Sequence, residues 1–173
     1  MTTATAPQTI VDTGKVTDYR KLRFSTIDEL LKEIDRLVAA DNGGKLRRTG
    51  NWTAGQIFGH LAGWMNFSYE GFPKRGARPP WFIRFILRMK KKAYMRDGMP
   101  RGVKIPGIEG GTFATEPLST QEGAQRLRAV LLRMKNREPV LHHSPAFGEM
   151  SDEERIAFQL RHAEVHLGFL HPS

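Results

Sequence analysis

The chain contains no cysteine, which excludes disulfide bonds, thiolate nucleophiles and sulfur-ligated metal sites. Any transition-metal site must therefore use nitrogen and oxygen ligands, and any thiol must come from a second molecule. Long hydrophobic runs are also absent, whereas a membrane-spanning helix needs about 20 apolar residues. The first residues lack the basic patch and apolar stretch of a secretory signal. We therefore expect a cytoplasmic protein with no transmembrane segment.

The net charge of +9 originates in one segment of the chain. Residues 74–104 contain eleven Lys and Arg and one acid, Asp97, whereas the remaining residues contain sixteen basic and seventeen acidic groups. Aromatic and aliphatic residues such as Trp81 and Phe82 alternate with these cations, which predicts an amphipathic helix over about residues 81–95. A nucleic-acid reader would carry polar base-reading residues between its cations. We therefore expect this helix to be a packed lid or a dimer surface, and we do not expect it to bind nucleic acid.

Capping signals and hydrophobic periodicity predict four long helices. The helix starts are marked by Ser25 or Thr26, by Thr53 with Gln56, by Ser119 with Glu122, and by Ser151 with Glu154. We expect these helices to end near Gly43, Phe72, Arg137 and Pro172. No stretch alternates between polar and apolar residues strongly enough to predict a sheet.

This pattern predicts an all-α fold in a single domain. We expect an antiparallel four-helix bundle over residues 25–173, preceded by a mobile N-terminal arm over residues 1–24. Residues 71–118 form a long crossover between the second and third long helices and carry the extra short helix. This crossover is longer than a minimal bundle needs, so we expect it to cover the functional site.

Three histidines carry the strongest functional signal. His162 and His166 are four residues apart, so their imidazoles leave one helix face about 40° apart, with Cβ atoms about 5–6 Å from each other. His60 belongs to the apolar stripe of the second helix and should point inward. If the second and last helices are neighbours, the three imidazoles can meet. Three histidine ligands suit a catalytic metal site, because they leave a coordination position open.

A structural explanation for the same histidines stays open. A pair of histidines four residues apart often has no ligand role, and His60 can be a hydrogen-bonded core residue beside Trp64. Glu164 does not complete the zinc-protease pattern, in which the glutamate directly follows the first histidine. It lies about 200° around the helix from both His162 and His166, so we expect it to be a solvated surface charge.

The motifs around these histidines resemble a known superfamily. The sequence Asn-Trp-Thr-Ala-Gly-Gln-Ile-Phe-Gly-His-Leu at residues 51–61 resembles the second-helix motif of DinB-like proteins, also called YfiT-like metal-dependent hydrolases. Arg-His-Ala-Glu-Val-His-Leu at residues 161–167 resembles their fourth-helix motif. The resemblance covers about residues 25–171 and is closest to a branch known as domain of unknown function 1569, which has counterparts of residues 98–100 and 143–148. It implies a four-helix bundle, a three-histidine metal centre and frequent homodimers.

The characterised proteins of this superfamily include hydrolases and thiol transferases that use bacillithiol, mycothiol or glutathione. We therefore expect a divalent transition metal, zinc or nickel, to activate water or a low-molecular-weight thiol for reaction with a small-molecule substrate. A proton-handling group is then needed nearby. His143 and Glu149, in the loop that enters the last helix, are the catalytic candidates, and Tyr69 and Gln159 are weaker ones.

Two other classes of function stay open. In the first, the chain is a non-catalytic module whose metal or empty histidine pocket stabilises a dimer or senses a ligand. In the second, the basic segment 74–104 binds an anionic membrane surface or nucleic acid through Trp81, Phe82 and the run from Lys90 to Lys92. Metal analysis and a substrate screen separate these classes.

Overall fold

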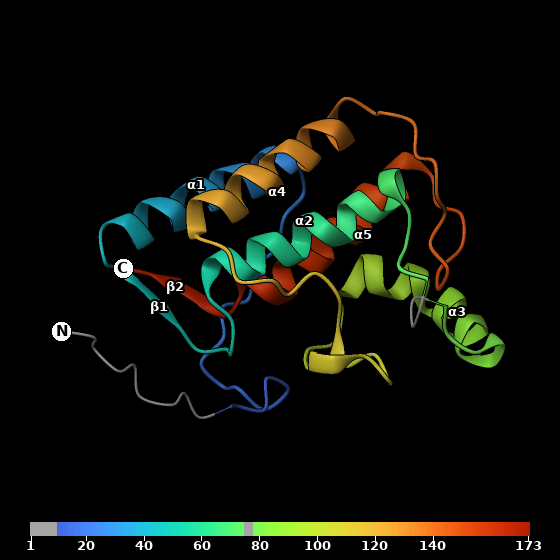
Figure 1. The fold of residues 1–173 in the computed structure, drawn as a ribbon, viewed down its shortest axis with the longest axis horizontal. Helices are drawn as coiled ribbons and strands as arrows, with labels where there is room; N and C mark the ends of the chain where they lie inside the picture. Colours follow the sequence, from blue (N-terminus) through green and yellow to red (C-terminus); the bar gives the residue numbers. More distant parts are fainter. Residues whose placement is uncertain (1–9, 75–77) are drawn as a thin grey trace.

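The structure is a computed structural model that describes residues 10–74 and 78–173. In this part of the chain a helical bundle forms the body of the molecule (Figure 1). Its helices are α1 (Ile27–Asn42), α2 (Ala54–Glu70), α4 (Thr120–Lys135) and α5 (Asp152–Leu167). The connection between α2 and α4 carries α3 (Trp81–Asp97) and a 3-10 turn, η1 (Glu109–Gly111). The predicted all-α bundle with an extra helix in the crossover is confirmed.

The predicted helix starts are also confirmed, because each predicted cap makes its hydrogen bond. The Thr26 side chain accepts a hydrogen bond from the backbone N–H of Glu29 at the start of α1. Complete capping boxes start the other three bundle helices, at Thr53, Ser119 and Ser151. Each box satisfies backbone N–H groups that a helix start leaves unpaired.

A short sheet ends the chain where the sequence pattern predicts continued helix. The helix α5 ends at Leu167, and strand β2 (Leu170–Pro172) then pairs antiparallel with strand β1 (Leu46–Arg48). The expectation of no sheet is therefore wrong at this point. Strands of three residues are too short to produce a detectable alternation.

The long crossover lets α2 and α4 run in the same direction, whereas α2 and α5 run in opposite directions (Figure 1). Two glycines allow α2 and α4 to approach closely. A Cβ atom on Gly123 would lie 2.5 Å from the carbonyl oxygen of Gly55, and one on Gly55 would lie 2.1 Å from the carbonyl oxygen of Leu118. Both distances are far inside van der Waals contact with backbone atoms, so a side chain at either position would push the two helices apart.

Replacing Gly55 by alanine is expected to lower the free energy of unfolding by about 2–3 kcal/mol, because the added methyl group overpacks the contact between α2 and α4. Urea unfolding followed by circular dichroism measures the loss. The matched control is Gly43→Ala, at an exposed position where an added Cβ would lie 3.4 Å from the carbonyl oxygen of Ala39. Its effect should stay within about 0.5 kcal/mol. Equal stability of the two variants would show that close helix approach is not required.

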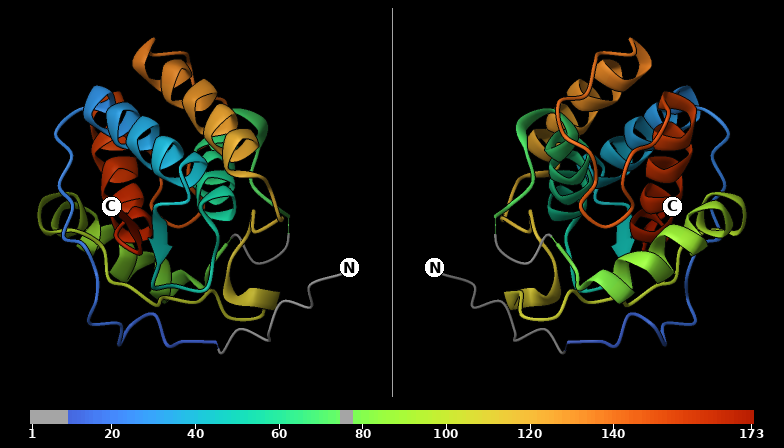
Figure 2. Two further views of the ribbon diagram at one scale, coloured as in Figure 1. Left: turned by 90° about the vertical axis from the view of Figure 1, so that its left-hand side faces the viewer. Right: turned by 90° about the vertical axis from the view of Figure 1, so that its right-hand side faces the viewer.

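The N-terminal segment and the crossover lie on the same side of the bundle, away from α4 (Figure 2). The segment contacts α5 before residue 25: the Tyr19 hydroxyl donates a hydrogen bond to the carbonyl oxygen of Glu164 over 2.9 Å, and Phe24 is buried. The division of the chain into an arm and a domain at residue 25 stays a prediction. Residues 1–9 of the predicted arm lie outside the described residues.

Helix α3 extends from the bundle and presents two different faces. One face, with Leu87 and Tyr94, lines a cavity beside α5, which agrees with the predicted lid. The other face is exposed, with Trp81 74% and Phe85 61% accessible to solvent. The lid therefore accounts for the inner face only, and the alternative that the outer face is a dimer surface stays a prediction. Within the described residues, no helix has both the length and the apolar content to cross a membrane.

Candidate metal centre

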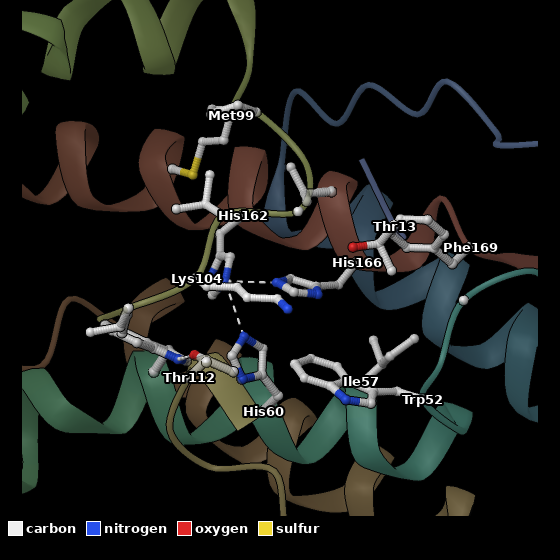
Figure 3. A pocket seen from close by; sticks show the side chains of 18 of the residues that line it. Thr13, Trp52, Ile57, His60, Met99, Lys104, Thr112, His162, His166 and Phe169 are labelled. Atoms are coloured by element: carbon white, nitrogen blue, oxygen red, sulfur yellow. Dashed lines mark hydrogen bonds between the residues drawn. The ribbon is translucent and has the colours of Figure 1, made fainter. Parts of the chain in front are cut away.

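The structure brings the three predicted histidines together between α2 and α5 (Figure 3). The Nε2 atom of His162 lies 3.3 Å from Nε2 of His60 and 3.1 Å from Nε2 of His166. The candidate ligand atoms of all three side chains lie within 4.8 Å of one another. The cluster forms because α2 and α5 are antiparallel neighbours, and each helix turns its histidines toward the other.

This donor set fits a divalent transition ion. Zinc binds imidazole nitrogen at about 2.0–2.1 Å, so two ligands of a tetrahedral site lie about 3.3–3.4 Å apart. The two measured Nε2 separations, 3.3 Å and 3.1 Å, are close to that value. Moreover, Nε2 of His162 faces two nitrogen atoms at once, and a single N–H can serve only one of them. A cation shared by the three lone pairs satisfies all of them.

A backbone carbonyl in the crossover orients His60. The Nδ1 atom of His60 lies 2.9 Å from the carbonyl oxygen of Phe113. Since a carbonyl only accepts, Nδ1–H is the donor, and Nε2 keeps its lone pair directed at His162. Histidine ligands of metal sites usually make such an outer hydrogen bond, which fixes the ring tautomer. Phe113 could not be predicted from the sequence, because its contribution is a backbone atom in an irregular loop.

Burial keeps the three imidazoles neutral. It lowers the pKa of His60 from 6.5 to about 4, and the hydrogen bond to Phe113 offsets this only in part. Burial, together with the nearby His60, lowers the pKa of His162 to about 3. The pKa of His166 is also held well below its ordinary value, mainly by burial. Neutral imidazole is the form that binds a metal ion, so the cluster is ready for a cation at neutral pH.

Acid is expected to destabilise the chelator-treated protein through His60. The unfolded chain keeps the ordinary pKa of 6.5, whereas the folded chain has a pKa of about 4. Between these values the unfolded chain binds more protons, so the free energy of unfolding falls as the pH falls. At about 1.4 kcal/mol for each pKa unit, the loss from His60 is about 3 kcal/mol. Urea unfolding of wild type and His60→Gln at pH 7 and pH 4.5 measures it. An equal loss in both proteins would contradict the assignment.

Two tryptophans frame the histidines. The Trp52 ring stacks on His166, with ring centroids 5.4 Å apart and an angle of 10° between the planes. The Trp64 ring meets the edges of His60 and His162, and its indole N–H donates to the Thr112 hydroxyl over 3.3 Å. These contacts limit rotation of the imidazoles. Neither tryptophan could be assigned to the site from the sequence, since the contact of Trp52 spans more than half of the chain.

The histidines lie in the wall of a cavity of about 360 Å³. Besides α2 and α5, its walls come from α3, from the loop that contains Met99 and Lys104, and from the turn around Gly111. The prediction that the crossover covers the site is therefore confirmed. The cavity is mostly apolar, with few polar side chains, which is typical of a pocket for a small molecule.

The structure does not bring the predicted catalytic residues His143 and Glu149 to the histidines. Both side chains are exposed, and neither lines the cavity. Their loop enters α5 at Asp152, ten residues and about 15 Å along the axis before His162, and within this loop Phe147, not His143 or Glu149, lines the cavity. A catalytic role for either residue stays a prediction that this geometry does not support.

The two weaker candidates differ in position. Tyr69 is buried away from the cavity, with the Arg133 guanidinium 4.0 Å from its ring centre. Gln159 lies one helical turn before His162 and lines the cavity. Within the described residues, the buried Oε1 atom of Gln159 has no hydrogen-bond partner. Gln159 is therefore the one of the four candidates that can contact a molecule in the cavity.

Glu164 is not the surface charge that the sequence analysis expected. Its side chain is buried and forms an ion pair with Arg161 at 2.9 Å. It also accepts a hydrogen bond from the backbone N–H of Phe24 over 2.6 Å. Burial is the largest effect on this carboxyl and raises its pKa. The side of α5 opposite the histidines is therefore covered by the N-terminal segment, which the helical spacing alone could not show.

The fold and the site define a helical-bundle protein with a three-histidine cluster in the wall of a cavity. The sequence profile of one protein family matches residues 16–173, nearly the whole chain. The chain belongs to this family, which is described as "Protein of unknown function (DUF1569)". No curated protein and no solved structure matches the chain significantly.

Proposed function

We propose that the protein is a metal-dependent enzyme of the DinB-like superfamily that acts on a small molecule by hydrolysis or thiol transfer. One divalent transition ion, zinc or nickel, would be held by His60, His162 and His166. The observation that carries this proposal is the convergence of three imidazoles on the wall of a cavity, where Nε2 of His162 lies 3.3 Å from Nε2 of His60 and 3.1 Å from Nε2 of His166. The likeness of residues 51–61 and 161–167 to the DinB-like motifs supports the superfamily, and with it a homodimer.

The residues of the chain define what the site can do. Three histidine ligands leave a coordination position for water, a thiol or the substrate, and an ion held there supplies Lewis acidity and a lowered pKa of the bound group. The Oε1 atom of Gln159 can accept a hydrogen bond from a donor in the cavity. Residues of the crossover form part of the cavity wall. Because the chain has no cysteine, a thiol reaction would require a separate low-molecular-weight thiol.

Metal analysis and a substrate screen on tag-free protein test the proposal. Elemental analysis should find one zinc or nickel ion per chain, and the metal-loaded protein should turn over a hydrolysable or electrophilic substrate, with water alone or with an added thiol. The His166→Ala variant should lose both properties. Turnover that persists equally in the variant would place the catalytic centre elsewhere. Stoichiometric metal without turnover would favour the non-catalytic binding module.

A second candidate function belongs to the outer face of α3. Its large apolar residues are between 46% and 74% exposed: Trp81, Phe82, Phe85, Ile86 and Met89. At 100° per residue they share one face. The exposed Arg88 and Lys90 lie at its two edges, and the exposed Lys92 follows it toward the C-terminal end of the helix. An exposed apolar face with flanking cations is typical of helices that lie on an anionic membrane surface. A second copy of this face is a poorer partner, because its cations would be opposed to each other.

Vesicle co-sedimentation tests this second function. The protein should bind vesicles of phosphatidylglycerol and phosphatidylcholine but not vesicles of phosphatidylcholine alone. Replacing Trp81 and Phe85 by alanine should remove binding, and so should replacing Lys90 and Lys92 by glutamine. A dimer in light scattering that dissociates on the Trp81 and Phe85 replacements, without vesicle binding, would instead assign the face to self-association. Tight nucleic-acid binding at physiological salt that is lost with the lysines would also overturn the membrane assignment.

A further inference from the structure

The charge of the cavity wall indicates which small molecules the site accepts, and this inference rests on the proposed metal centre. We infer that the cavity selects a molecule with a flat apolar body and one carboxylate or comparable anionic group, and that Lys104 recognises the anion. The inference therefore names a class of substrate and the residue that determines the specificity for it.

The apolar part of the cavity wall indicates which shape and polarity the bound molecule should have. Rings of Trp52, Trp64, Phe147 and Phe158 line the cavity, together with aliphatic side chains such as Val103. The volume of about 360 Å³ is at the lower end of the range for small-molecule sites. Aromatic walls favour a flat apolar group, which stacks on them.

The charged and polar residues of the cavity wall indicate which charge the bound molecule should carry. The proposed ligands are neutral imidazoles, so the two positive charges of a divalent ion are not compensated by the protein. Among the described residues that line the cavity there is no aspartate or glutamate, and Lys104 is the one that carries a permanent charge. The two charges of an ion held by buried, neutral imidazoles in an apolar cavity favour an anion beside it. Lys104, which is exposed at the cavity wall, adds a third positive charge to the same space. A neutral molecule would pair with neither cation.

The loop around Lys104 holds its side chain over the cavity. Figure 3 shows this side chain pointing into the cavity, toward the histidines. Its stem packs on Gly111, where an added Cβ would lie 2.9 Å from Cγ of Lys104. The backbone N–H of Ile105 donates to the carbonyl oxygen of Gly111 over 2.7 Å and joins the two loop segments. The ammonium group is therefore positioned to pair with an anion that also approaches the metal centre.

Calorimetric titration with a matched pair of probes tests the inference. The probes are 2-naphthoate and 2-naphthamide, which have the same ring system and differ in charge. Zinc-loaded wild-type protein should bind 2-naphthoate at least tenfold more tightly than 2-naphthamide. Lys104→Met, which keeps the apolar stem against Gly111, should reduce this preference at least fivefold, and Lys104→Arg should retain it. Lys90→Met, at an exposed position outside the cavity, should behave like the wild type.

Zinc content measured on the same samples separates this inference from the proposed function. If the protein holds stoichiometric zinc, three results overturn the inference and leave the proposed function standing. They are equal affinity for the two probes, no binding of 2-naphthoate, and a preference that Lys104→Met does not change. Absence of zinc overturns the metal centre. The preference for 2-naphthoate over 2-naphthamide can then still be measured, because Lys104 alone should produce a weaker preference. If the metal-free protein shows no preference that depends on Lys104, the inference is overturned as well.

Discussion

Replacing His162 by alanine is expected to reduce bound zinc or nickel from one ion per chain to a small residual fraction. His162 is the centre of the cluster, since its Nε2 atom is within 3.3 Å of both other ligand nitrogens. Removing it leaves two ligands, so affinity should fall by more than the 10–100-fold that loss of an outer-shell partner causes. Elemental analysis after dialysis, followed by titration against a zinc chelator, measures the change.

The control for this variant is His143→Ala. His143 is an exposed histidine outside the cavity, so its removal should leave the metal content unchanged. The same sample also tests the predicted catalytic role of His143, which should show as lost turnover with retained metal. If His162→Ala keeps metal at the wild-type ratio, the ion is bound elsewhere on the chain and the proposed function fails at its first step.

Replacing Glu164 by alanine is expected to lower the free energy of unfolding by about 3–5 kcal/mol. The variant leaves the buried guanidinium of Arg161 without its carboxylate and the backbone N–H of Phe24 without its acceptor. Both groups lie where α5 contacts the N-terminal segment, so that segment should detach first. Urea unfolding at pH 7 measures the loss, and limited proteolysis within residues 10–24 should become faster.

The matched control is Glu153→Ala on the same helix. Glu153 pairs with Arg137 at 2.8 Å, but both side chains are more than 60% exposed, so solvent screens the pair and its loss should change the free energy of unfolding little. A Glu164→Ala variant as stable as this control would show that the buried ion pair contributes little. Metal content should stay near one ion per chain in the folded fraction, because Glu164 lies on the side of α5 opposite the histidines.

The local features of the fold could be predicted from the sequence because they depend on neighbouring residues. Capping boxes at Thr53, Ser119 and Ser151 involve residues three positions apart, and each one starts a helix where it was predicted. The helical period also placed His162 and His166 on one face of α5 and His60 on the inner face of α2. For the three-histidine cluster, local spacing together with one assumption about neighbouring helices was sufficient.

The rest depends on contacts between segments far apart in the chain, which local periodicity does not encode. The pairing of β1 with β2, the burial of Glu164 and the carbonyl of Phe113 beside His60 each arise only when distant segments pack. The distance of Glu149 from the histidines follows from the length of α5, and the position of Lys104 follows from an irregular loop. The sequence by itself therefore determined the helices and the spacing of the three histidines, whereas tertiary packing decided the tautomer of His60 and the charge and shape of the cavity.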